Sequence, residues 1–226
     1  MDDSGTYKTV VGSLPWTDRT EWMYPAYDKN RNDWCFVRGP IDVDPALEII
    51  LPHLKNRDCC IQAGGCVGIW PIRLAQFFAV VHTFEPEPVN YQCLINNTEG
   101  IDNIHSHESA LGKDRDLMVH IAVPKNLTGN CGAGQVIEGG EIKTTCIDDL
   151  NVDPSLIYLD IEGSEYDALT GASETIHRCR PVIGMEDKGW NSRYNNGASP
   201  VDLLVSEFNY KVLCKPFRSD IILVPC

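Results

Sequence analysis

The stretch CIQAGGCVGIW at residues 60–70, followed by VVHTFEP at residues 80–86, decides the fold of this chain. An apolar run ends in a glycine-rich turn and leads into a helical pattern, and a second apolar run then ends in an acid. This order is typical of a nucleotide-binding βαβ unit.

Glycines and one acid have separate expected roles in this unit. Gly64 and Gly65 permit a tight turn and a close approach of the backbone to a ligand, and Gly68 is expected to let the first helix pack against the first strand. Glu85 lies 21 positions after Gly64 and should stand at the carboxyl end of the second strand. There its carboxylate can accept hydrogen bonds from two ribose hydroxyls.

Composition narrows the class of protein. The chain has 226 residues, of which 43% are hydrophobic and 23% charged, so we expect one globular α/β unit rather than disorder. The net charge of −13 repels nucleic-acid phosphates and anionic bilayers. We therefore expect a neutral, cationic or small polar substrate, and neither a nucleic-acid nor a membrane partner.

Ten cysteines raise the question of disulfides. The sequence opens with Met1-Asp2-Asp3-Ser4 and shows no charged-then-apolar leader, which favours a cytoplasmic protein with reduced thiols. The cysteines also lack paired Cys-x-x-Cys spacing, so no metal site is expected. No run of 18 apolar residues is present to span a membrane.

The first 44 residues differ in character from the rest. They are rich in aromatic residues and prolines and show no sustained period, so we interpret residues 1–44 as an arm and residues 45–226 as the main domain. The arm can either cover the core or roof a substrate pocket. A helix is expected to begin at Asp44-Pro45, because proline suits a first helical turn.

From there, strand-like and helix-like segments alternate, which predicts an α/β sheet with helices on both faces. Strands are expected near residues 59–63, 80–84, 104–110, 156–161 and 181–186, and helices near 69–78, 87–98, 165–177 and 199–208.

Two further pairs of apolar runs indicate antiparallel strands. Leu117–Val123 and Ile142–Ile147 flank a glycine-rich segment, 129–140, and predict an added hairpin with a mobile loop. Residues 210–214 and 220–224 are joined so closely that they must pair antiparallel. A terminal antiparallel hairpin on a mostly parallel, seven-stranded sheet is typical of Rossmann-like class I methyltransferases and unlike the usual dehydrogenase sheet.

A second constellation of acids follows a later strand. In LIYLDIEG, residues 156–163, strand alternation puts Asp160 and Glu162 on the same side, roughly 6–7 Å apart. Paired acids at this edge can bind a cation, orient an amine or act as a base, and Glu186 near the end of the next strand can join them. Alternatively, the acids favour the dipole at the start of the following helix. Trp190 then either walls the acceptor pocket or packs as an ordinary aromatic.

Over residues 45–226 the chain resembles the FkbM-type, S-adenosylmethionine-dependent methyltransferases. The matching pieces are Gly64 and Gly68, FEPEP at 84–88, Asn97, ALG at 110–112, TCIDDL at 145–150, DIEGSE at 160–165 and LTGA at 169–172. The resemblance implies S-adenosylmethionine as the cofactor.

By this resemblance, the glycine turn holds the methionine part of the cofactor, Glu85 the ribose, and residues 108–110 the adenine. The predicted cofactor-binding residues are Gln62, Ala63, Gly64, Gly65, Gly68, Glu85, Pro86, Glu108, Ser109, Ala110 and Asp160. The predicted catalytic residues are Asp160, Glu162 and Glu186.

The implied reaction is transfer of a methyl group to a hydroxyl of a small polar or sugar-like acceptor. The chain departs from the family pattern at Gln62, where an acid is usual, at Cys66, where Asn is common, and at Tyr158, where Lys is common. These departures leave a non-catalytic module of the same fold open as an alternative. A nicotinamide-dependent oxidoreductase is a further alternative, since Glu85 could also hold the ribose of NAD(P).

Overall fold

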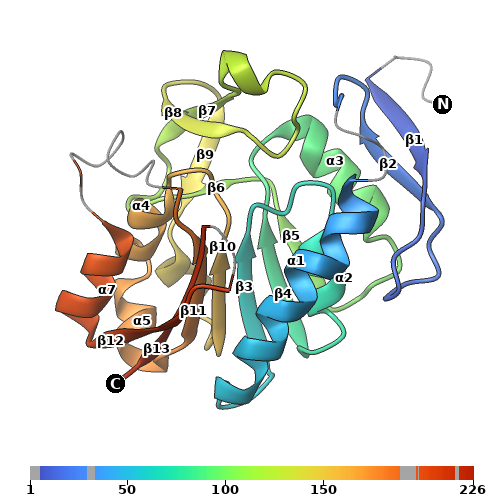
Figure 1. The fold of residues 1–226 in the computed structure, drawn as a ribbon. Helices are drawn as coiled ribbons and strands as arrows, with labels where there is room; N and C mark the ends of the chain where they lie inside the picture. The colour runs from blue at the N-terminus through green and yellow to red at the C-terminus, as the bar shows by residue number, and fades with distance from the viewer. Residues whose placement is uncertain (1–5, 30–33, 189–196, 198, 217–218) are drawn as a thin grey trace.

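The computed structural model describes residues 6–29, 34–188, 197, 199–216 and 219–226; Trp190 lies outside these ranges. Within them, seven strands form the central sheet in the order β12-β13-β11-β10-β3-β4-β5, and β13 runs antiparallel to both of its neighbours while the other neighbouring pairs are parallel (Figure 1). This confirms the predicted Rossmann-like sheet and its terminal hairpin. The strands are β3 Cys59–Ala63, β4 Val80–Phe84, β5 Ile104–His107, β10 Leu156–Leu159, β11 Val182–Glu186, β12 Tyr210–Cys214 and β13 Asp220–Pro225.

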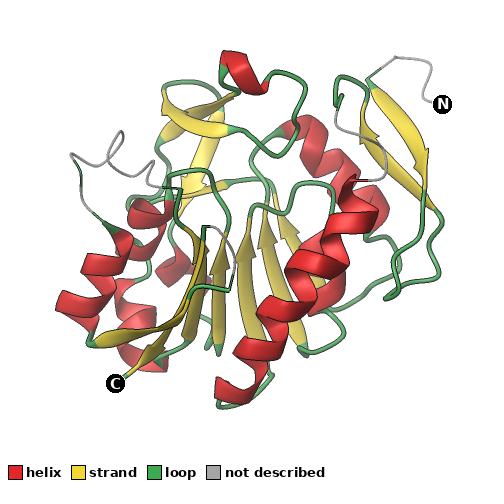
Figure 2. Ribbon diagram, in the orientation of Figure 1, coloured by secondary structure: helices red, strands yellow, loops and turns green. Residues whose placement is uncertain are grey.

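Helices cover both faces of this sheet (Figure 2). Along β10, Leu156 and Tyr158 pack in the cluster with α1 and α2, while Ile157 and Leu159 pack in the cluster with α4, α5 and α7. Successive side chains of a strand point to opposite faces, so a strand buried on both sides is apolar throughout. The helices are α1 Trp34–Ile50, α2 Ile69–Leu74, α3 Pro88–Asn97, α4 Glu165–Thr170, α5 Ser173–Cys179 and α7 Pro200–Phe208, with short 3₁₀ turns η1 Leu51–His53, η2 Lys125–Leu127 and η3 Ile147–Leu150.

Several predicted helix bounds were wrong. Helix α1 begins ten residues before Asp44, at Trp34. The helix expected over 69–78 ends at Leu74, where Asn103 Nδ2 donates to the carbonyls of Ala75 and Phe78 and holds a turn. The helix expected over 165–177 is divided into α4 and α5 around Gly171. At Gly171 the backbone passes so close to Gly112 that a Cβ would lie 2.1 Å from its carbonyl oxygen.

The added segment is a second, smaller sheet. In the described residues its strands lie in the order β6-β9-β7-β8, with bounds β6 Ala110–Leu111, β7 Met118–Ala122, β8 Gln135–Glu138 and β9 Ile142–Thr145. Antiparallel pairing of β7 with β9 confirms the predicted hairpin. The glycine-rich segment 129–140 is not simply a loop, because it contains β8. The predicted strand 104–110 is also divided, since β5 ends at His107 and Ala110 belongs to the smaller sheet.

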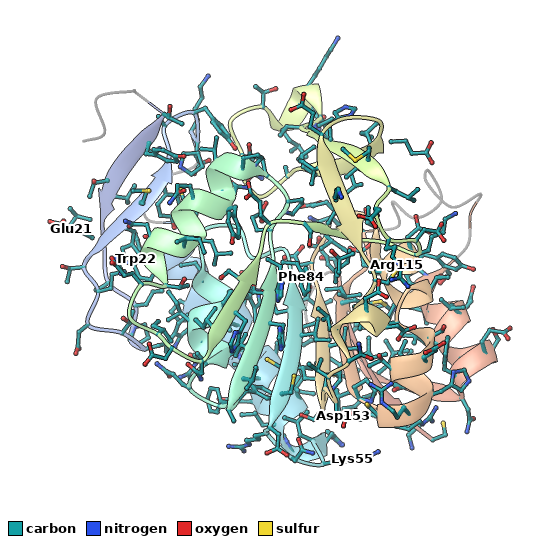
Figure 3. All side chains as sticks on the ribbon, turned by 180° about the vertical axis from the view of Figure 1, so that it is seen from behind. Glu21, Trp22, Lys55, Phe84, Arg115 and Asp153 are labelled. Carbon is teal, nitrogen blue, oxygen red and sulfur yellow. The ribbon has the colours of Figure 1, made fainter. Side chains whose placement is uncertain are left out.

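The arm forms a hairpin that the sequence pattern did not predict. Strands β1 Tyr7–Val11 and β2 Glu21–Pro25 pair antiparallel, and Trp22 on β2 is completely buried (Figure 3). Asn97 at the end of α3 hydrogen-bonds the hairpin to the main domain. Its Oδ1 accepts from Met23 N at 2.8 Å, and its Nδ2 donates to the carbonyls of Met23 and Val67. The arm therefore covers the core, which is one of the two roles predicted for it.

We predict that Asn97→Ala lowers the free energy of unfolding by about 3 kcal/mol, because it leaves buried backbone groups without partners. Urea denaturation measures the change. Gln92→Ala, on the exposed side of the same helix, is the matched control and should change stability by less than about 0.5 kcal/mol. Equal losses in the two variants would contradict this role for Asn97.

Candidate functional site

A cleft of about 660 Å³, open to solvent on one side, lies at the carboxyl ends of β3, β4 and β10. The smaller sheet contributes Ile121 and Val136 to its lining, so that sheet roofs the cleft. Open α/β sheets bind ligands at this edge. The predicted site residues in the lining are Ala63, Gly64, Glu85, Pro86, Ser109, Ala110, Asp160 and Glu162.

Gly64 begins the turn after β3 in the left-handed region, with φ +85°. Its N–H and that of Gly65 both donate to the carbonyl of Phe84, at 3.0 and 2.9 Å. A Cβ at Gly64 would lie 2.0 Å from the backbone oxygen of Asp160. Only glycine satisfies both the dihedral angle and this contact, so the predicted tight turn is confirmed, and the close backbone approach at Gly64 is to Asp160.

Gly68 has a different role from the one predicted. It is the N-cap of α2 with φ +102°, and a Cβ there would meet Thr98 and Leu94 of the α3 region at 3.3 and 3.4 Å. The glycine therefore allows a close contact with α3 rather than with β3. It also lies outside the cleft lining.

Glu85 is buried at the end of β4, with 5% of its surface exposed. Its Oε2 accepts from Cys66 N at 2.7 Å and its Oε1 from Glu87 N at 3.0 Å. Burial raises the pKa of this carboxyl to about 7, although the backbone donors oppose the shift. Beside it, Asn90 Oδ1 is buried and has no hydrogen-bond partner among the described residues.

Gln62 is completely buried and does not line the cleft. Its Nε2 donates to the carbonyls of Ala63 and Gly64, both at 3.0 Å, and its Oε1 accepts from the Thr83 hydroxyl. The structure places this side chain beneath the glycine turn, where it braces the backbone. Glu108 is likewise outside the lining, because its side chain is exposed at the end of β5.

Three carboxylates meet on the β10 side of the cleft. Oxygen atoms of Asp160, Glu162 and Glu186 all lie within 4.8 Å of one another. Lys188 Nζ lies 2.6 Å from Glu186 Oε2 and 3.0 Å from Glu162 Oε1. The structure thus brings the predicted catalytic residues together, but Glu186 itself is not part of the lining.

The predicted reason for this meeting was wrong. Strand β10 ends at Leu159, so strand alternation does not align Asp160 with Glu162. Instead the chain turns sharply, with left-handed backbone at Glu162 (φ +55°) and Gly163 (φ +109°). The turn folds Glu162 back toward Asp160.

Burial and like charge dominate the electrostatics of this cluster. Burial, followed by the charges of Glu186 and Glu162, holds the pKa of Asp160 well above its usual range. Burial also raises the pKa of Glu162, although Lys188 opposes this shift. Burial acts to lower the pKa of Lys188, but the carboxylates reverse the effect and raise it.

Sequence reasoning missed four residues at this site: Asn90, Cys131, Lys188 and Tyr27. Asn90 and Cys131 line the cleft, and Lys188 balances the carboxylates. Tyr27 of the arm is 41% exposed and lies outside the lining, and partial burial and then the charge of Glu87 raise the pKa of its hydroxyl. Only Lys188, two residues after the predicted Glu186, had a sequence signal that could have revealed it.

The fold and the cleft are those of a Rossmann-like methyltransferase. The model of the "Methyltransferase FkbM domain" family matches residues 72–212. This match covers more than half of the sequence, and the chain therefore belongs to the FkbM methyltransferase family. Membership of this family implies S-adenosylmethionine as the cofactor. A search of the curated proteins found no relative of the chain.

Solved structures share the fold. The putative methyltransferase yhhF from Escherichia coli is 10% identical, with a TM-score of 0.53 over 97% of this chain and 99% of that one. A putative methyltransferase from Streptococcus mutans, solved in complex with SAH, is 9% identical, with a TM-score of 0.51 over 83% and 98%. An FkbM methyltransferase from Methylobacillus flagellatus KT is 22% identical with a TM-score of 0.48; the match covers 74% of this chain, which spans 42% of that protein's length.

Within the described ranges, none of the helices combines the length and the hydrophobicity needed to cross a lipid bilayer.

Glu165 opens α4 next to the carboxylate cluster, where the sequence suggested a helix-dipole role. It is 1% exposed, and its Oε1 accepts from the N–H groups of Ile161 and Gly163 at 3.2 and 3.4 Å. Its Oε2 has no partner within the described part of the chain. Burial raises the pKa of this carboxyl to about 7.

This raised pKa predicts an inverted pH dependence of stability. Between pH 4.5 and about 7 the folded protein keeps the Glu165 proton while the unfolded chain loses it, so the free energy of unfolding falls as pH rises through this window. Glu165→Gln retains the Oε1 acceptor and removes the titration. We expect this variant to exceed the parent protein by up to about 3 kcal/mol near pH 8 and to match it near pH 4.5.

Urea denaturation of both proteins across this range tests the expectation, with exposed Glu99→Gln as the control that should follow the parent curve. A constant offset between Glu165→Gln and the parent at every pH would show that the carboxyl does not titrate there.

Proposed function

We propose that this chain transfers a methyl group from S-adenosylmethionine to a hydroxyl oxygen of a small polar or sugar-like acceptor. The observation that carries the proposal is the half-buried Asp160 in the cleft: its backbone carbonyl lies against Gly64, and its carboxylate lies next to two further acids. When bound, the cofactor supplies a methyl group that its sulfonium has already made electrophilic. The chain has to align the acceptor and remove its proton.

The cleft residues fit this cofactor. A ribose offers hydroxyl donors, and the cleft presents acceptors: the carboxylate of Glu85 and the buried Asn90 Oδ1 that lacks a partner among the described residues. Each carboxylate oxygen of Glu85 retains a lone pair after accepting its backbone N–H. Phe84, Ala110 and Leu111 provide apolar surface for the adenine ring.

Asp160 is the residue we propose as the base. A hydroxyl is a weak nucleophile, and a positioned carboxylate of raised pKa accepts its proton more readily than an ordinary one. Lys188 holds Glu162 and Glu186 in ion pairs at the same place. Its ammonium partly offsets the like charges around Asp160.

The surroundings of the site support a small-molecule or glycan acceptor. A net charge of −13 disfavours a nucleic-acid substrate and an anionic membrane surface. Family membership favours the methyltransferase over the nicotinamide-dependent alternative.

The non-catalytic alternative rests on Gln62. Gln62 is uncharged and lies beneath the turn, where it hydrogen-bonds the backbone. Position 62 therefore offers no acid that could attract the cofactor's ammonium group. The proposal therefore requires that the cleft binds the cofactor without an acid at position 62, which a binding measurement tests directly.

We predict that Glu85→Ala weakens binding of S-adenosylhomocysteine by about 10–100-fold, because its carboxylate is the main ribose acceptor. Isothermal titration calorimetry measures the affinity. Exposed Glu99→Ala is the control and should bind as the parent does. Absence of binding by the folded parent protein would overturn the cofactor assignment.

For catalysis, we predict that Asp160→Asn lowers kcat by about 10²–10⁴-fold while the chain still binds S-adenosylhomocysteine. Methyl transfer to a panel of sugars and small polyols, followed with cofactor labelled at the methyl group, gives the rate. Retained turnover in Asp160→Asn would reject Asp160 as the base. Cofactor binding with no turnover on any acceptor class would favour the non-catalytic alternative.

A further inference from the structure

Two cysteines face each other inside the cofactor cleft. Cys66 belongs to the glycine turn after β3, and Cys131 belongs to the segment that leads into β8 of the roof. Their Sγ atoms are 3.7 Å apart, and both residues line the cleft. Because 65 positions separate them, only the tertiary structure brings the two sulfurs together.

The backbone on each side of this pair is fixed by a neighbouring contact. Cys66 has a left-handed backbone, φ 47°, and donates its N–H to Glu85. The carbonyl of Cys131 accepts from Asn90 Nδ2 at 2.8 Å. Glu85 and Asn90, which make these two hydrogen bonds, are also the proposed ribose acceptors. The two sulfurs therefore lie within the proposed cofactor site.

We propose that Cys66 and Cys131 form a reversible thiol–disulfide modification site whose reactant is a low-molecular-weight disulfide such as oxidised glutathione. The thiolate of Cys66 attacks one sulfur of glutathione disulfide, which releases one glutathione thiolate. The thiolate of Cys131 then attacks Cys66 Sγ and displaces the second glutathione. The two protein thiols are oxidised to one disulfide, the reagent is reduced to two glutathione thiols, and the two thiol protons pass to those products.

The order of attack follows from exposure. Cys66 is half-buried, whereas Cys131 is buried with 7% of its surface exposed, so the reagent reaches Cys66 first. Bond formation requires the sulfurs to approach from 3.7 Å to about 2.05 Å. Cys93, which is buried next to Cys131, has 0% exposure and a pKa raised by burial, so it is a poor competitor.

The disulfide has a consequence that rests on the proposed cofactor function. It would join the glycine turn directly to the roof, across the space that the cofactor has to enter. The oxidised chain should therefore bind S-adenosylhomocysteine more weakly than the reduced chain, and a reducing thiol should restore the affinity. Oxidation would in this way switch methyl transfer off reversibly.

The test equilibrates the purified chain with mixtures of reduced and oxidised glutathione and has two independent readouts. Intact mass and peptide mapping report the 66–131 link, and calorimetry reports affinity for S-adenosylhomocysteine. We expect the link to form and the affinity of the oxidised chain to fall by about tenfold or more. Cys131→Ser and Cys66→Asn should prevent both changes; Asn suits the left-handed backbone at position 66. Exposed Cys226→Ser is the matched control and should behave as the parent.

The outcomes separate the two proposals. Glutathione attached to single cysteines without a 66–131 link, or a link between other cysteines, would overturn the modification site. A 66–131 link that leaves the affinity unchanged would overturn its role as a switch. Failure of the reduced parent chain to bind S-adenosylhomocysteine would instead reject the proposed function, while the mapping still decides whether the disulfide forms.

Discussion

The close approach of Gly64 to the backbone of Asp160 is the constraint on which the site depends. Strands β3 and β10 are parallel neighbours with Ala63 opposite Leu159, so the chain leaves both strands at the same level. A side chain at position 64 would overlap the carbonyl of Asp160, and the left-handed backbone there would be strained. Because this contact brings the two turns together, the cofactor turn and the proposed base lie beside each other.

Burial of carboxylates then gives the site its chemistry. Water is the best solvent for a charged acid, so a carboxyl that folding removes from water holds its proton more strongly unless donors or cations compensate it. Backbone donors at Glu85 and Lys188 beside Glu162 oppose this shift, although the pKa of both carboxyls stays raised. Asp160 combines burial with the like charge of its neighbours and keeps a raised pKa. The burial that lowers the free energy of unfolding at high pH also makes a carboxylate a better proton acceptor.

Helix α3 connects this site to the two parts of the chain that surround it. Asn90 and Asn97 are seven residues apart, which places them on one face of the helix, two turns from each other. Asn90 holds the carbonyl of Cys131 in the roof, and Asn97 holds Met23 of the arm together with Val67, next to the glycine turn. Roof, arm and turn are thus fixed to a single helix.

The sequence by itself determined the βαβ unit, the terminal hairpin and the approximate positions of the sheet strands, because these depend on local apolar periods and on turns that only glycine accommodates. It also indicated the acids of the site, since strand ends of a parallel sheet share one edge. Only the tertiary structure decided which of these residues face the cleft: Gln62 lies beneath the turn and Glu108 faces solvent. The arm hairpin, the ion pairs of Lys188 and the contact between Cys66 and Cys131 also came from the tertiary structure alone. The contact of the arm with α3, the Lys188–Glu162 pair and the cysteine contact join segments far apart in the chain, which leaves no periodic trace in the sequence.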